Sequence, residues 1–127
     1  MDSNSNVVAF DECAVKAVDP ARVAAARERL LAPADAGRLA QMYRLLGDAT
    51  RVRLLFALLE AGELCVCDLA ATVGAAETTV SHALRLLRTA GVVRNRRDGR
   101  MICYSVDDAH VRLLLDLSRE HLQHEGG

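Results

Sequence analysis

The sequence predicts a mainly α-helical domain with one small β-hairpin, and three observations lead to this prediction. The chain has 127 residues, enough for one compact core, and 51% of them are apolar although only 3% are aromatic. Leucine, valine and alanine must therefore build the core, which favours helices. Apolar residues recur at helical spacing, and two strand-like runs flank the dipeptide Asp98-Gly99.

Capping and breaking residues bound the expected helices. Pro20 opens the first helix and Pro33 ends it, Asp35 caps the second, and Gly74 separates the fourth from the fifth. The third helix has one apolar face, formed by Val52, Leu55, Phe56 and Leu59. The expected helices cover residues 20–31, 35–46, 48–60, 65–73, 77–90 and 107–124.

The fourth and fifth helices, joined by a short turn containing glycine, are typical of a helix-turn-helix. In the fifth, an apolar stripe lies opposite short polar groups and an arginine, which reach base edges and phosphates when such a helix lies in a major groove. An ordinary amphipathic surface helix would show the same pattern, so this stretch alone leaves both interpretations open. The candidate DNA-contacting residues are Thr78, Thr79, Ser81, His82 and Arg85.

The charge distribution favours the DNA-binding interpretation. A net charge of −1 argues against a general polyanion binder, yet six arginines and one acid, Asp98, lie between Thr78 and Val106. A hairpin rich in arginine directly after a helix-turn-helix is a wing, which holds phosphates or probes the minor groove. The sequence therefore predicts a winged helix-turn-helix that binds double-stranded DNA, with wing contacts from Arg96, Arg97 and Arg100.

The expected last helix has a broad apolar face, formed by Val111, Leu114, Leu115 and Leu122. A terminal helix this apolar needs a partner, and a two-fold homodimer would match a palindromic operator.

Three of the four histidines lie in this last helix. His121 and His124 are one turn apart, but His110 and His121 are separated by about 16 Å along the axis, too far to share one ion. Four ligands to one ion must then come from two antiparallel copies of the helix. The candidate intersubunit set comprises Asp108, His110, His121 and His124. These nitrogen and oxygen donors suit Zn(II), with Co(II) or Ni(II) as alternatives. The other interpretation is that they are solvated histidines near a frayed terminus.

A second candidate metal site is Cys65-Val66-Cys67. With no signal peptide or membrane span expected, the protein is predicted to be cytoplasmic, where thiols stay reduced. Two such cysteines can share an ion only at an irregular helix N-terminus, which would also favour thiolate over thiol. Cys13, on an expected mobile arm of residues 1–18 before a domain of residues 19–127, is the candidate third ligand. The alternative is that both cysteines pack as small apolar groups, as we expect for Cys103.

Three segments together resemble the ArsR/SmtB metalloregulatory repressors: LGDATRVRLL (46–55), ELCVCDLA (63–70) and TTVSHALRLLR (78–88). The resemblance runs from about Asp19 to His124, and ELCVCDL is similar to the motif of the family's cadmium/lead (CadC-like) and arsenic sensors. The arsenic type carries a further cysteine where Ala70 stands here. The CadC-like type implies a thiolate site for Cd(II) or Pb(II) made by Cys13, Cys65 and Cys67, and the terminal-helix pattern resembles the site of the family's zinc sensors.

The resemblance implies a repressor whose apo dimer binds an operator and dissociates when metal binds, derepressing metal efflux or resistance genes. An arsenite-responsive or thiol-redox-responsive repressor of the same fold is the alternative. An enzyme is disfavoured because C-x-C is not the redox motif C-x-x-C, and no glutamate accompanies the paired histidines as in H-E-x-x-H. A metal buffer would not explain the arginine-rich wing.

Overall fold

The computed structural model describes residues 7–10 and 13–126, with side chains from residue 17 onward. The chain divides into two compact units, residues 1–38 and 39–127. No helix in the described ranges is both long and apolar enough to cross a membrane.

The N-terminal unit contains an antiparallel strand pair that was not predicted, β1 (Val7–Phe10) and β2 (Cys13–Lys16). Helix α1 (Pro20–Arg29) follows, and the Asp19 carboxylate caps it by accepting a hydrogen bond from the backbone N–H of Arg22 at 3.1 Å. Pro33 was expected to end this helix, but it begins α2 (Pro33–Leu46). Proline suits a first helical turn because its missing N–H would have no partner there.

Three helices form the core of the second unit: α3 (Ala49–Ala61), α4 (Val66–Val73) and α5 (Glu77–Thr89). The predicted apolar face of α3 was partly wrong, because only Leu55 of that set is buried. The core instead receives Leu54, Leu55 and Leu58, while Val52, Phe56 and Leu59 are half-buried. The other fully buried side chains include Leu69, Val80, Leu84 and Leu87.

A three-stranded antiparallel sheet packs against these helices, in the order β3-β5-β4. Its strands are β3 (Leu64–Cys65), β4 (Val93–Asp98) and β5 (Met101–Val106). The predicted hairpin is therefore confirmed, although Asp98 pairs with Met101 and the turn consists of Gly99 and Arg100. Strand β3 was not predicted: Cys65 was expected to begin a helix but ends a strand.

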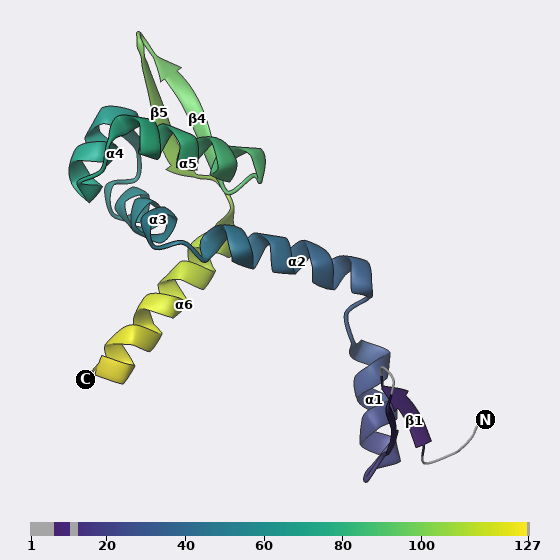
Figure 1. Cartoon of the computed structure of the whole chain (residues 1–127). Helices are drawn as coiled ribbons and strands as arrows, with labels where there is room; N and C mark the ends of the chain where they lie inside the picture. The colour runs from purple at the N-terminus through teal and green to yellow at the C-terminus, as the bar shows by residue number, and fades with distance from the viewer. Residues whose placement is uncertain (1–6, 11–12, 127) are drawn as a thin grey trace. The chain divides into compact units, whose positions relative to one another are not determined.

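The turn between α4 and α5 depends on Gly74, which has a left-handed conformation with φ of 69°. The backbone N–H groups of Gly74 and Ala75 both donate to the carbonyl oxygen of Ala70, at 2.8 and 3.1 Å, and so close α4. Helix α5 then begins at Glu77, and the wing follows it (Figure 1). The winged helix-turn-helix predicted from the sequence is confirmed.

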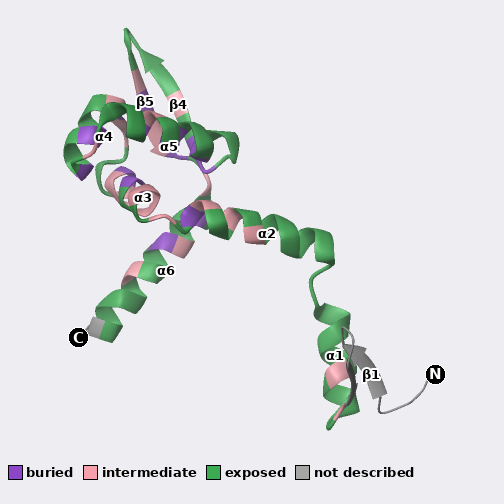
Figure 2. Ribbon diagram, viewed as in Figure 1, coloured by how far each residue is buried: buried purple, intermediate pink, exposed green. Residues whose placement is uncertain are grey.

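The last helix, α6 (Ala109–Gly126), begins two residues later than expected because Asp108 is its cap. Val111 and Leu115 are buried in the core of the unit. By contrast, Leu113, Leu117 and Leu122 of the same helix are 60%, 55% and 64% exposed, and most of α6 is coloured as exposed in Figure 2. Three leucines of α6 are therefore left exposed within one chain.

We expect Gly74→Ala to lower the free energy of unfolding by about 1 kcal/mol, because any L side chain is strained in the left-handed region. A Cβ at this position would meet nothing within 4 Å, so the strain would come from the backbone alone. The measurement is urea denaturation of the intact chain.

Gly37→Ala is the matched control, because Gly37 lies inside α2 and a Cβ there also meets nothing within 4 Å. This substitution should raise stability by about 0.5–1 kcal/mol. Effects of the same sign at both glycines would contradict the conformational explanation.

Candidate metal centre and nucleic-acid interface

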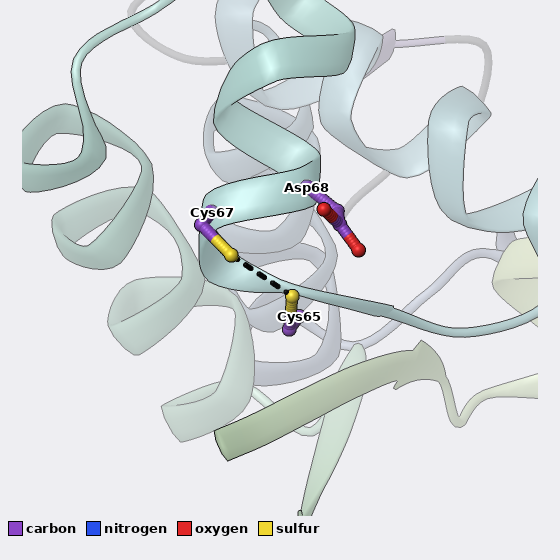
Figure 3. Close-up of side chains that lie close together, drawn as sticks. All are labelled: Cys65, Cys67 and Asp68. Carbon is purple, nitrogen blue, oxygen red and sulfur yellow. Dashed lines mark hydrogen bonds between the residues drawn. The ribbon is translucent and has the colours of Figure 1, made fainter. Parts of the chain in front are cut away.

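The two cysteines of the C-x-C motif lie side by side at the junction of β3 and α4. Cys65 ends the strand with an extended backbone (φ −80°, ψ 168°), and Cys67 lies in the first turn of α4. Their Sγ atoms are 3.2 Å apart and point toward each other (Figure 3). On a regular helix, residues two apart point to different sides, so the strand conformation of Cys65 is what brings the thiols together.

The carboxylate of Asp68 lies close to both thiols. Ligand atoms of Cys65, Cys67 and Asp68 all lie within 4.8 Å of one another, and this is the only such group of three among the described residues. Asp68 was not among the ligands predicted from the sequence, although its position directly after the C-x-C motif was an available signal. Two sulfurs and a carboxylate oxygen form a mixed donor set suited to borderline and soft cations.

The expectation that the helix N-terminus would favour the thiolate of Cys67 was wrong. The hydrogen bond with Cys65 raises the pKa of Cys67, and burial and the negative charges of Asp68 and Glu77 raise it further. The hydrogen bond, the burial and the nearby negative charges all disfavour the thiolate of Cys67. A cation bound at this site would therefore displace the proton of the Cys67 thiol.

A cavity of about 200 Å³ opens beside the thiols. Three elements line it, the β3–α4 junction, the first turn of α5 and strand β5, through Cys65, Val66, Cys67, Glu77, Met101 and Ile102. The cysteine site thus adjoins both halves of the DNA-binding architecture.

The other two cysteines differ from this pair. Cys103 is the cross-strand partner of Cys65 and is buried, and this burial raises the pKa of its thiol. These features suit the packing role expected for it. The backbone of Cys13 begins β2, but its side chain lies outside the described residues, so its role as a ligand stays a prediction.

Helix α5 presents the polar face expected of a recognition helix. Its apolar stripe, which includes Val80 and Leu84, is buried in the core (Figure 2). Ser81 is half-buried, and the other candidate DNA contacts of this helix are exposed, namely Thr78, Thr79, His82 and Arg85.

The three candidate arginines of the wing are not equivalent. Arg97 and Arg100 are exposed, but the Arg96 guanidinium binds both carboxylate oxygens of Glu63, each at 2.7 Å. This pairing lowers the pKa of Glu63. To contact a phosphate, the Arg96 guanidinium would have to give up at least part of its hydrogen bonding to Glu63. In the structure it connects the wing to the residue before β3.

The terminal-helix residues form pairs within one chain. The Asp108 Oδ1 atom accepts hydrogen bonds from the backbone N–H groups of His110 and Val111, at 2.8 and 3.3 Å, and lies 3.3 Å from His110 Nδ1. Farther along, His121 Nε2 lies 3.7 Å from Glu125 Oε2, and His124 is exposed. A complete four-ligand site from these residues still requires a second subunit, which stays a prediction.

The fold and the exposed face of α5 define the class of protein as a winged helix-turn-helix DNA-binding regulator. Residues 48–95 match the family model described as "Bacterial regulatory protein, arsR family". A cadmium resistance transcriptional regulatory protein CadC homolog of Staphylococcus aureus is 36% identical over 111 residues, covering 87% of this chain and 91% of that protein. The chain belongs to the arsR family and is a regulatory protein rather than an enzyme.

Two further relatives are similar in sequence or structure. A transcriptional repressor SmtB homolog of Synechocystis is 45% identical over 89 residues, covering 70% of this chain and 67% of that protein. The crystal structure of the AntR antimony-specific transcriptional repressor is similar with a TM-score of 0.71 and 36% identity, covering 76% of this chain and 87% of that one.

Asp108 has a structural role that can be separated from metal binding. We expect Asp108→Ala to lower the free energy of unfolding by about 1 kcal/mol, because it removes the cap of α6, whereas Asp108→Asn keeps most of it. Urea denaturation with chelator present measures both variants.

The same cap predicts a pH dependence. Burial raises the pKa of Asp108, but the backbone hydrogen bonds outweigh it and hold the pKa below its ordinary value of 3.8. The advantage of wild type over Asp108→Ala should be complete above that value and decline as the pH falls through the folded-state pKa. An advantage that grew on acidification would contradict this assignment.

Proposed function

We propose that the protein is a cytoplasmic metal-responsive repressor that binds operator DNA as an apo homodimer and dissociates when Cd(II), Pb(II) or Zn(II) binds. The target genes would encode metal efflux or resistance. The observation that carries this proposal is the paired thiols of Cys65 and Cys67, 3.2 Å apart at the start of the helix-turn-helix. In this position an ion would contact the segment that supports both α5 and the wing.

The proposed inducer site is a thiolate site for Cd(II) or Pb(II). Its ligands are Cys65 and Cys67, with Asp68 within reach and Cys13 supplied by the arm of residues 1–18. Soft thiolates favour these ions over hard cations. The cadmium-resistance regulator among the relatives supports the same choice.

Dimerisation is proposed to use the terminal helix. A cavity of about 470 Å³ lies between α6, α3 and the end of α2, lined by apolar side chains that include Tyr43, Phe56 and Leu122. Together with the exposed leucines of α6, it offers a large apolar surface that a second copy could cover. Such a dimer would bring Asp108 and His110 of one copy to His121 and His124 of the other, forming a Zn(II) site.

A metalloid inducer is the second candidate, favoured by the similarity to an antimony-specific repressor. Ala70, where the arsenic sensors resembled by this sequence carry a cysteine, is buried in the core. A third sulfur ligand would therefore have to come from another part of the protein. To test this candidate, antimonite and arsenite should be titrated alongside cadmium.

Cys65→Ser and Cys67→Ser are expected to abolish release of DNA by Cd(II) or Pb(II) and to leave apo DNA affinity unchanged, because neither cysteine is among the candidate DNA-contacting residues of α5 and the wing. The probe is a duplex selected from random DNA by the wild-type protein, followed by fluorescence anisotropy with added metal. Cys103→Ala is the matched control and should respond as wild type.

His121→Ala tests the zinc site in the same titrations. If both cysteine variants still release DNA with cadmium and His121→Ala does not, the terminal-helix site is the switch. If no metal or metalloid releases wild-type protein, the proposed function is wrong.

Cadmium affinity should rise with pH near neutrality, because the raised pKa of Cys67 keeps that thiol protonated and binding must displace the proton. Each displaced proton makes the apparent affinity about ten-fold tighter per pH unit. Titrations against a competing chelator at several pH values, corrected for its own protonation, measure this slope. A pH-independent affinity would mean that Cys67 is not a ligand or is already ionised.

A further inference from the structure

Glu77 lines the cavity beside the two cysteines although it belongs to a different element. It is the first residue of α5, whereas Cys65 and Cys67 belong to the β3–α4 junction. The Glu77 carboxylate is not part of the group of ligand atoms within 4.8 Å formed by Cys65, Cys67 and Asp68, so its exposed side chain would have to turn into this cavity of about 200 Å³ to reach an ion held at the thiols. The same cavity is also lined by Met101 of the wing, whose thioether is a soft donor.

The Glu77 carboxylate is available for such a contact. Within the described part of the chain, it makes no ion pair and no side-chain hydrogen bond, and its side chain is exposed. Glu63, also close in sequence to the cysteines, has both oxygens engaged by Arg96 at 2.7 Å. Asp68 can reach the thiols, but it lies on α4 beside them and cannot connect them to another helix.

We propose that the Glu77 carboxylate binds the ion held by Cys65 and Cys67, so that the metal ties the first turn of α5 to the cysteine strand. This inference rests on the proposed function, because it concerns how the same site acts on DNA. Thr78 and Thr79, the next two residues of α5, are exposed candidates for base or phosphate contacts. A pull on Glu77 would therefore move the end of the helix that is proposed to enter the groove.

The ligand chemistry is that of a borderline or soft divalent cation in a mixed sulfur and oxygen set. Once the ion has displaced their protons, the two thiolates and the nearby carboxylates supply negative charge that a divalent ion neutralises. Glu77 would add an oxygen donor from outside the motif. Hard cations would prefer sites without sulfur. Cadmium chloride is the appropriate probe because thiolate-to-cadmium charge transfer reports directly on bound sulfur.

The first test is Glu77→Gln in the full-length protein. Gln keeps the size of the side chain and loses the charge, so cadmium affinity should fall at least about ten-fold in competition with a chelator. The cadmium-induced loss of affinity for the selected duplex should shrink as well. Asp98→Asn is the matched control, because it removes an acid from the wing tip that does not line the cavity; it should retain wild-type cadmium affinity.

The second test is Glu77→Cys, which replaces the oxygen donor by sulfur. If this position contacts the ion, charge-transfer absorbance per bound cadmium should increase by the contribution of one thiolate. Unchanged cadmium affinity in Glu77→Gln together with unchanged absorbance in Glu77→Cys would overturn the inference. If wild type binds cadmium but keeps DNA, the proposed function fails, while the two metal titrations still decide whether Glu77 is a ligand.

Discussion

The pairing of β3 with β5 is the contact on which the cysteine site depends. Cys65 pairs with Cys103 and Leu64 with Tyr104, and this register holds Cys65 in an extended conformation. Helix α4 can therefore start only at Val66, one residue before Cys67. If Cys65 were helical instead, the two thiols would point to different sides and no longer lie 3.2 Å apart. The same strand pairing attaches the cysteines to the wing.

The acidic residues around the two thiols differ in whether an arginine neutralises them. Arg96 neutralises Glu63, whereas Asp68 and Glu77 remain near the thiols and help to raise the pKa of Cys67. The Cys67 thiol is consequently favoured over its thiolate, and a bound cation would have to displace its proton. The site lies where α4, α5 and β5 meet.

Much of the fold could be predicted because its signals are local. Gly74, the polar face of α5 and the dipeptide Asp98-Gly99 act through neighbours within a few residues, and they marked the helix-turn-helix and the wing correctly. The predictions were wrong where the same local sequence is compatible with more than one structure. Pro33 can end one helix or begin the next, and either of two overlapping apolar faces of α3 could have entered the core. A two-residue strand such as β3 has no periodicity of its own to detect.

By itself, the sequence determined the class of fold, the surface proposed to face DNA and the pair of cysteines, since each depends on residue type and short spacing. Only the tertiary structure decided that Cys65 is a strand residue, that Asp68 lies beside both thiols and that Glu77 shares their cavity. It also decided that Arg96 binds Glu63, a residue 33 positions away. These features require segments distant in the chain to meet, and such meetings depend on how the helices and the sheet pack around the common core.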